Sequence, residues 1–133
     1  MKRDVKWDQE HCASNGLSAE SISGDRNQSQ REATLAKFRS GRITMLIATD
    51  VAARGLDIAG VKRVINYNFP LEFADYIHRI GRTGRAGATG AADTLFTDGD
   101  KLHAKELVRV LKDAGQAVPA GLNRLTSQRI VFD

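Results

Sequence analysis

Residues 73–85 read Phe73-Ala-Asp-Tyr-Ile-His-Arg-Ile-Gly-Arg-Thr-Gly-Arg85, an amphipathic pattern that runs into arginines separated by glycines. Four apolar side chains in this stretch recur at i, i+3, i+4 and i+7, which predicts a helix with one buried face. They are Phe73, Tyr76, Ile77 and Ile80. Glycines at positions 81, 84 and 87 end the helix and let the backbone approach a ligand closely. The stretch therefore predicts a core helix that leads into a glycine-rich binding loop.

The arginines of this loop, Arg82 and Arg85, suit a polyphosphate ligand. A guanidinium group donates hydrogen bonds in a planar fork and keeps its charge near neutral pH. His78 lies four residues before Arg82, on the face that both arginines would share if the helix continued. The alternative is a basic helix end that favours the C-terminal helix dipole and faces water. The close interleaving of arginine with glycine favours the binding interpretation.

Length and composition predict one soluble domain. The chain has 133 residues, of which 41% are hydrophobic and 27% charged, and its net charge of +4 is compatible with a polyanionic partner without requiring one. The single cysteine, Cys12, excludes an internal disulfide and a cysteine-based zinc site, and it favours a reducing compartment. No apolar run approaches the ~20 residues that span a bilayer. We therefore expect an intracellular protein, nuclear or cytoplasmic, with no membrane partner.

The order of the predicted elements indicates the fold class. Helices are expected at residues 2–15, 27–39, 73–80 and 99–113, and strands at 17–23, 45–48, 63–67 and 91–96. Strands and helices that alternate through long connections predict an α/β domain with a parallel sheet and right-handed crossovers. The strand Met45-Leu-Ile-Ala48 is a continuous apolar run, of the kind buried on both faces of such a sheet. Ligands of these folds gather beyond the carboxyl ends of the strands.

Gln28 and Arg31 lie at the start of a predicted helix that follows a strand. Residues three apart share a face, so both side chains lie beside the free N–H groups of the first turn. A helix N-terminus with an added arginine can hold a phosphate. The alternative is an ordinary capped and solvated helix start.

A second polar group, between residues 48 and 57, follows the apolar strand. Thr49 could hydrogen-bond a phosphate, and Asp57 could accept a hydrogen bond from a sugar hydroxyl. Arg54 could fix Asp57 through an ion pair. The alternative is a loop whose aspartates cap a short helix at residues 51–54.

Several kinds of catalytic machinery are absent from the sequence. The three histidines have no metal-ligand spacing between them, so we expect no metal site in this chain. The sequence also contains no Gly-x-Ser-x-Gly elbow and no Gly-x-x-x-x-Gly-Lys-[Ser/Thr] phosphate loop. Arginines that can stabilise a transferring phosphoryl group are thus present without the residues that bind a nucleotide. This asymmetry predicts a half-site that another domain completes.

The chain resembles the C-terminal RecA-like domain of DEAD-box ATP-dependent RNA helicases. The resemblance lies in four motifs, which occur in the family's order: Gly24-Asp25 with Gln28-x-x-Arg31, Ala48-Thr-Asp-Val-Ala-Ala-Arg-Gly-Leu-Asp57, Val64-Ile-Asn-Tyr67 with Pro70, and His78 to Arg85. It implies a RecA-like three-layer sandwich with a mainly parallel sheet, formed by residues 1–115. From their own sequence, residues 116–133 are expected to form a largely irregular C-terminal extension with at most one short turn of helix. The family's first strand, which lies inside the sheet, has no counterpart before Lys2. We therefore expect its neighbours to lack hydrogen-bond partners and the chain to be destabilised or aggregation-prone.

The resemblance also implies roles for single residues. The positions that hold the sugar-phosphate backbone of RNA are matched by Gly24, Gln28, Arg31 and Thr49. His78 and Arg79 match positions that couple the RNA site to the ATP site. The chain departs from the family at Asn68, where an acid is usual, and at Asp93, where an aromatic residue is usual.

On the ATP side, Arg82 and Arg85 match the arginine fingers that reach the γ-phosphate. Asp57 matches the residue that meets the ATP ribose, with Arg54 beside it. ATP with Mg²⁺ is then bound mainly by a separate N-terminal RecA-like lobe, which this chain does not contain.

These roles imply the C-terminal lobe of an RNA helicase, in which ATP closes two lobes on one RNA strand and a short duplex is unwound. We expect a monomer that contacts RNA without sequence preference and has no ATPase activity by itself. The alternative is a standalone, non-enzymatic RNA-binding or regulatory module derived from that lobe.

Overall fold

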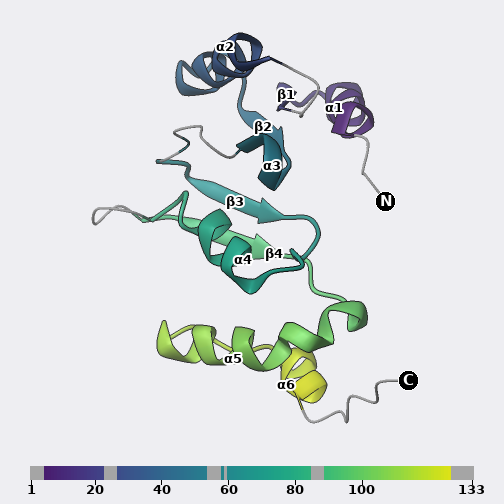
Figure 1. Cartoon of the computed structure of the whole chain (residues 1–133), viewed down its shortest axis with the longest axis vertical. Helices are drawn as coiled ribbons and strands as arrows, with labels where there is room; N and C mark the ends of the chain where they lie inside the picture. Colours follow the sequence, from purple (N-terminus) through teal and green to yellow (C-terminus); the bar gives the residue numbers. More distant parts are fainter. Residues whose placement is uncertain (1–4, 23–26, 54–57, 59, 85–88, 127–133) are drawn as a thin grey trace. The chain divides into compact units, whose positions relative to one another are not determined.

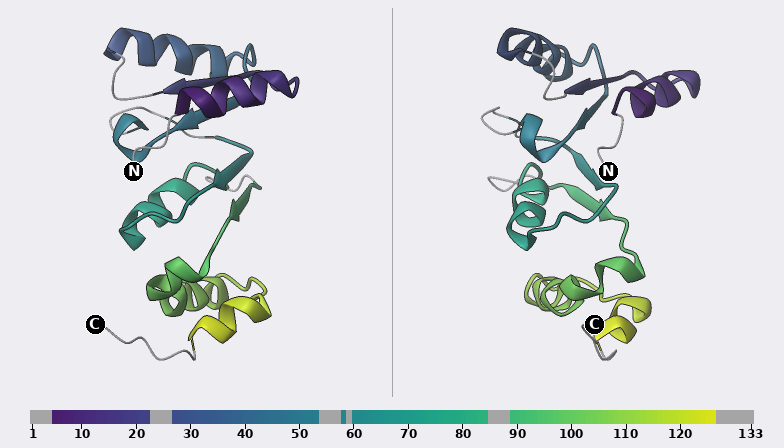
Figure 2. Two further views of the ribbon diagram at one scale, coloured as in Figure 1. Left: turned by 90° about the vertical axis from the view of Figure 1, so that its right-hand side faces the viewer. Right: turned by 45° about the vertical axis from the view of Figure 1, so that its right-hand side comes forward.

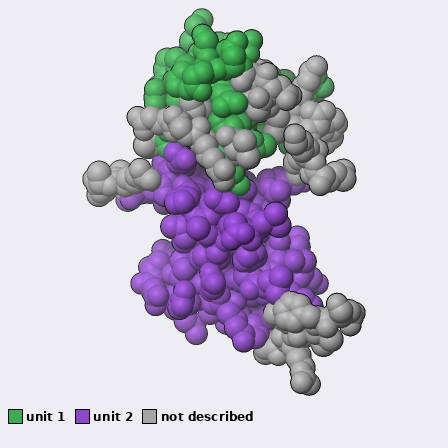
Figure 3. Space-filling view, viewed as in Figure 1, with its two compact units in different colours: residues 1–58 green, residues 59–133 purple. Residues whose placement is uncertain are grey.

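The computed structural model describes residues 5–22, 27–53, 58, 60–84 and 89–126, and the chain divides into two compact units (Figure 3). Unit 1 is residues 1–58 and unit 2 is residues 59–133. Unit 1 contains α1 (Val5–Ser14), β1 (Ala19–Ile22), α2 (Gln28–Arg39), β2 (Met45–Ala48) and α3 (Asp50–Ala53). Unit 2 contains β3 (Arg63–Asn66), α4 (Phe73–Ile80), β4 (Ala91–Thr94), the 3-10 helix η1 (Asp98–His103), α5 (Ala104–Asp113) and α6 (Ala120–Thr126) (Figure 1).

Unit 1 has three layers. Its strands β1 and β2 pair in parallel, and α1 and α2 pack against them (Figure 2). The backbone N–H and the hydroxyl of Ser21 both donate to Gln9 Oε1 of α1 at 2.8 Å. The neighbouring Glu20 accepts from Lys37 Nζ of α2 at 2.9 Å. Because successive side chains of a strand point to opposite faces, the two helices cover opposite faces of the pair.

The strand β2 is less buried than its apolar sequence predicts. Met45, Leu46 and Ile47 are half-buried and Ala48 is exposed. The helices α1 and α2 contact β1 more than β2, and Ile22 of β1 is fully buried. Among the strands that the structure describes, β1 is also the one hydrogen-bonded neighbour of β2. The prediction that this strand is buried on both faces is therefore wrong.

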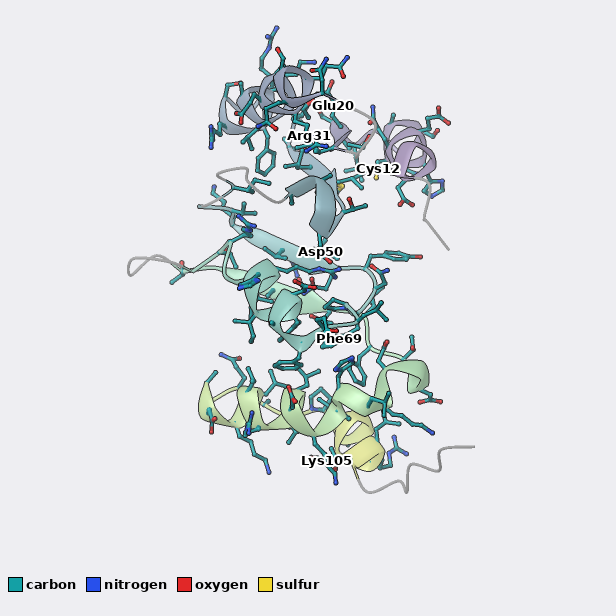
Figure 4. All side chains as sticks on the ribbon, in the orientation of Figure 1. Cys12, Glu20, Arg31, Asp50, Phe69 and Lys105 are labelled. Carbon is teal, nitrogen blue, oxygen red and sulfur yellow. The ribbon has the colours of Figure 1, made fainter. Side chains whose placement is uncertain are left out.

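Unit 2 has a second parallel pair, β3 and β4, with a core of side chains from the loops and helices that follow. The buried members of this core are Phe69, Tyr76, Ala104, Leu107, Val108 and Leu122. Phe69 lies at its centre, stacked on Tyr76 at 5.1 Å and edge-on to Phe96 at 5.2 Å between ring centroids (Figure 4). Offset and edge-to-face aromatic pairs of this kind stabilise a core beyond the area that they bury.

The apolar stripe of α4 is narrower than its spacing predicts. Tyr76 is buried and Phe73 and Ile80 pack against the core, whereas Ile77 is 39% exposed. The helix α4 packs against β3 on the face of the fully buried Asn66, which Arg79 of α4 approaches. The other face carries exposed apolar side chains, namely Ile65, Tyr67 and Leu95.

The C-terminal part of unit 2 is more ordered than predicted. The helix expected at residues 99–113 begins as η1, whose N-terminal Thr97 and Asp100 form a capping box, and continues as α5. Within residues 116–126, α6 has seven residues and packs on α5, where at most one short turn was expected. The domain boundary at residue 115 remains a prediction. No helix in the described ranges is long and apolar enough to cross a membrane.

Candidate functional site

Six of the predicted site residues lie in the described parts of the chain. Gln28, Arg31 and Thr49 belong to unit 1, and His78, Arg79 and Arg82 belong to unit 2. The other four, Gly24, Arg54, Asp57 and Arg85, lie outside the described residues. The expected ion pair between Arg54 and Asp57 therefore stays a prediction.

The start of α2 is fixed by a capping box at Asn27. The Asn27 side chain accepts the backbone N–H of Gln30 at 2.8 Å, and the Gln30 side chain accepts the backbone N–H of Asn27 at 3.1 Å. This reciprocal pairing satisfies two N–H groups that the helix cannot pair internally. The sequence prediction that α2 opens at residue 27 or 28 is confirmed, and with it the placement of Gln28 and Arg31 on the first turn.

Gln28 and Arg31 differ in their surroundings. Gln28 is exposed and donates to Glu32 Oε1 at 3.1 Å, one turn along the helix. Arg31 is half-buried and lies on the strand side of α2 (Figure 4). A half-buried side chain is held more firmly than an exposed one. Arg31 is therefore better pre-organised than Gln28 to bind an anionic ligand.

Thr49 caps the short helix α3. Its hydroxyl oxygen accepts the N–H of Ala52 at 3.3 Å, and its carbonyl accepts the N–H of Ala53 at 3.0 Å. The short helix of the alternative interpretation is thus present, but its cap is a threonine and Asp50 lies within its first turn. A hydroxyl that accepts one hydrogen bond still has a proton to donate, so capping leaves Thr49 able to bind a phosphate oxygen.

The helix α4 ends where the glycines predict. The N–H of Gly81 bonds to the Ile77 carbonyl at 3.0 Å, and the N–H of Arg82 bonds to the Arg79 carbonyl at 3.2 Å. Gly81 keeps a right-handed backbone, with φ −66°, whereas Gly84 has φ 67°. Only glycine adopts such a positive φ without strain, so Gly84 is the residue that turns the chain after Arg82.

Arg82 is anchored through its backbone. Its carbonyl accepts the N–H of Val61 at 3.1 Å, which ties it to the entrance of β3. The side chain of Arg82 is half-buried, and His78, one turn earlier on α4, is exposed. The backbone of Arg82 is therefore held by a helix end and by the entrance of a strand at once.

Arg79 joins α4 to β3. Its Nη1 donates to the carbonyl of Asn68 at 2.7 Å and lies 3.5 Å from Asn66 Oδ1. Asn66 in turn donates from Nδ2 to Thr94 Oγ1 of β4 at 3.1 Å. Because Arg79 bonds to the backbone of Asn68, the departure from the family's usual acid at this position leaves the contact intact. Sequence reasoning missed Asn66, although a lone amide within an apolar strand was a usable signal.

Three ionisable groups of unit 2 have shifted pKa values, and the geometry explains the direction of each shift. The hydrogen bond between Arg63 and Asp93 raises the pKa of Arg63 and lowers the pKa of Asp93. This cross-strand pair explains why an aspartate is tolerated on β4. Burial raises the pKa of Tyr76, while its hydrogen bond with Thr94 acts in the opposite direction.

The chemistry of the described site residues is that of anion binding. They offer guanidinium, amide, imidazole and hydroxyl donors. Within the described ranges, no three His, Cys, Asp or Glu side chains gather into a possible metal site. The described residues of each unit thus carry groups that can donate hydrogen bonds to an anion, and they include no candidate magnesium ligand cluster.

Comparisons with known proteins agree with this chemistry. A family model described as the helicase conserved C-terminal domain matches residues 1–87. The chain is 50% identical over 123 residues to the ATP-dependent RNA helicase DBP3 of Mycosarcoma maydis, which covers 92% of this chain and 21% of that protein. The chain thus spans about a fifth of the length of this curated relative.

Solved structures give the same family likeness. The yeast DEAD-box splicing factor Prp28 matches with a TM-score of 0.83 and 31% identity, over 96% of this chain and 31% of that one. The RNA helicase Prp28 from Chaetomium thermophilum bound to ADP matches with a TM-score of 0.82 and 38% identity, over 93% of this chain and 31% of that one. These likenesses confirm the predicted fold class, a RecA-like α/β domain with parallel strands.

Proposed function

Because this chain belongs to the helicase conserved C-terminal domain family, as a DEAD-box RecA-like domain, we propose that it is one lobe of an ATP-dependent RNA helicase. In this proposal the chain supplies arginine fingers to ATP and backbone contacts to single-stranded RNA. Its partner is an N-terminal RecA-like lobe, and the working enzyme is an intracellular monomer, nuclear or cytoplasmic. The chain by itself has no ATPase activity, since it has no nucleotide-binding loop.

The observation that carries the proposal is the double anchoring of Arg82. Its amide is bonded to the end of α4 and its carbonyl to the entrance of β3. An arginine whose backbone is held in this way has less freedom to lose when it meets a phosphate, so more of its binding energy is available in the transition state. Arg82, with Arg85 three residues later, would stabilise the charge that develops on the γ-phosphoryl group during transfer.

The rest of the nucleotide site is shared with the other lobe. ATP with Mg²⁺ is bound mainly by that lobe, and the metal neutralises charge on the phosphate oxygens there. From this chain, Asp57 would accept a hydrogen bond from the ribose, with Arg54 orienting its carboxylate. His78 and Arg79 would couple this site to RNA, and Arg79 is already tied to the end of β3 by the Asn68 carbonyl.

The RNA contacts belong to unit 1. Arg31 and Gln28 on the first turn of α2, and Thr49 at the end of β2, offer donors to phosphate and ribose oxygens. Gly24 would let the protein backbone approach the RNA strand closely. Contacts of this type read no bases, so binding is expected to be independent of sequence and to weaken as salt rises.

The test is RNA affinity in the presence of the second lobe. Fluorescence anisotropy of a labelled single-stranded RNA is measured with this chain mixed with a DEAD-box N-terminal lobe, with and without a non-hydrolysable ATP analogue. We expect the analogue to raise RNA affinity, Arg82→Ala to remove that rise, and Arg31→Ala to weaken binding in both conditions. Arg42→Ala, an exposed arginine outside the proposed site, is the matched control.

An RNA affinity that is unaffected by the analogue would contradict the helicase proposal. Retained binding through Arg31 without any nucleotide dependence would instead favour the standalone RNA-binding module. No RNA binding in either condition, from a folded chain, would contradict both functions.

A further inference from the structure

The base of the glycine-rich loop is closed by a tight contact between Thr83 and Gly90. A Cβ atom at Gly90 would lie 2.0 Å from Thr83 Oγ1 and 2.6 Å from the backbone nitrogen of Gly84. Both distances are shorter than van der Waals contact, so no side chain fits at position 90 while the loop keeps this position. The backbone of Gly90 is outside the positive-φ region, so the requirement for glycine here comes from space.

Two hydrogen bonds flank this contact. The N–H of Val61 bonds to the Arg82 carbonyl at 3.1 Å, and the N–H of Ala91 bonds to the Lys62 carbonyl at 3.0 Å. Val61 and Lys62 are consecutive, so both ends of the loop are bound at the entrance of β3. We call this arrangement the clasp. Its members are Val61, Lys62, Arg82, Thr83, Gly90 and Ala91.

Thr83 contributes to the clasp through its shape. Its Oγ1 is buried and has no hydrogen-bond partner within the parts of the chain that the structure describes. A buried hydroxyl without a partner is normally unfavourable, so its retention in the tight contact points to a steric role. Thr83 and Gly84 directly follow Arg82, so a backbone shift that relieves the clash with the Gly84 nitrogen at 2.6 Å also moves the arginine.

We propose that Gly90 is a positioning residue for Arg82, acting through Thr83. The inference rests on the proposed function, in which Arg82 reaches the γ-phosphate of ATP. Gly90 itself touches no substrate in this account. Without a side chain at position 90, Thr83 and Gly84 can lie against Gly90 while Arg82 stays bonded to the entrance of β3, and a side chain at this position pushes Thr83 and Arg82 outward.

The experiment measures ATP turnover by this chain mixed with a DEAD-box N-terminal lobe and single-stranded RNA. A displacement of about 1 Å can cost about a hundredfold in rate, so Gly90→Ala should lower kcat by about ten- to a hundredfold. The RNA affinity should stay near wild type, because the contacts of α2 are untouched. The KM for ATP should also stay near wild type, because the loss falls on the transition state. The matched control is Gly99→Ala, where a Cβ would meet only Thr97 Oγ1 at 3.5 Å.

A double variant separates positioning from general loss of folding. Thr83→Ala in the Gly90→Ala background removes the closest clash, at 2.0 Å, and leaves the contact with the Gly84 nitrogen. We expect it to recover part of the lost kcat, that is, a non-additive cycle. Additive effects, or a kcat of Gly90→Ala equal to that of Gly99→Ala, would overturn the inference.

A readout that needs no activity distinguishes this inference from the proposed function. In the ¹⁵N-labelled chain, Gly90→Ala should shift the backbone amide signals of Arg82 and Gly84, whereas Gly99→Ala should leave them in place. If the wild-type mixture hydrolyses no ATP but these signals move, the proposed function is wrong and the clasp stands. If the signals of Arg82 and Gly84 do not move, the clasp is wrong whatever the turnover.

Discussion

Asn66 is the residue through which α4, β3 and β4 are joined by hydrogen bonds in unit 2. It is 2% exposed, donates to Thr94 Oγ1 at 3.1 Å and lies 3.5 Å from Arg79 Nη1. Asn66→Ala would leave a cavity and unpaired polar atoms, and we expect a loss of about 1–3 kcal/mol in the free energy of unfolding. Chemical denaturation measures this loss.

The matched control for Asn66 is two residues away. Asn68 is exposed, and its backbone carbonyl, which alanine keeps, accepts a hydrogen bond from Arg79. Asn68→Ala should therefore change the free energy of unfolding by less than about 0.5 kcal/mol. Equal losses for the two variants would show that Asn66 does not have the joining role assigned to it.

Tyr76 gives the chain a pH dependence at the alkaline end. Burial raises its pKa above the ordinary value of 10.0, and the Thr94 hydrogen bond only partly offsets this. In the unfolded chain the phenol ionises at lower pH, so this stabilisation is full below pH 10 and is lost as pH rises through the folded pKa. Urea denaturation between pH 7 and pH 11 should show a smaller alkaline loss for Tyr76→Phe than for wild type. An alkaline profile of Tyr76→Phe identical to that of wild type would contradict the prediction.

At the scale of single elements, α2 depends on its capping box. Asn27→Ala removes the side chain that accepts the Gln30 N–H, and such changes cost about 1 kcal/mol. We expect this loss in the free energy of unfolding and a weaker RNA affinity, because the first turn carries Gln28 and Arg31. Ser29→Ala, an exposed site in the same turn, should be nearly neutral. A cap variant as stable as Ser29→Ala would mean that the capping box does not hold the turn in place.

The elements could be predicted from the sequence where local chemistry decides them. Asn27 starts α2 through its own side chain, and Gly41 and Gly115 follow helix ends with positive φ values of 79° and 69°. What could not be predicted depends on residues distant in the chain. The exposure of Ile77 and of Ala48 reflects where other helices pack, which no periodicity within a single stretch contains.

The candidate site divides in the same way. Motif spacing alone identified Arg31 and Arg82 and the helix ends that position them. The hydrogen bonds that tie Arg79 and Arg82 to residues outside α4 come from 11 and 21 positions away, so they needed the structure. Asp93, which is out of place on a strand by its sequence, is accounted for by Arg63, thirty residues before it.

At the scale of the whole molecule, the strands form two separate pairs among the described residues, β1 with β2 and β3 with β4. Two-stranded sheets are marginally stable, and open edges with exposed apolar faces favour aggregation. We therefore expect the chain alone to aggregate on heating. Ile65→Thr, at a side chain that is 59% exposed, should slow aggregation, whereas Ile22→Thr, fully buried in β1, should unfold the chain. Reversible, cooperative unfolding above ~50 °C would contradict this expectation.

The most direct test of the central claim is ATP hydrolysis by this chain mixed with a DEAD-box N-terminal lobe, with and without single-stranded RNA. The account predicts RNA-stimulated turnover that neither component shows alone, lost in the Arg82→Ala, Arg85→Ala double variant and kept in Arg42→Ala. The double variant should still bind RNA through unit 1. Turnover that survives the loss of both arginines, or no turnover from a folded mixture that binds RNA, would contradict the assignment of this chain as a catalytic lobe.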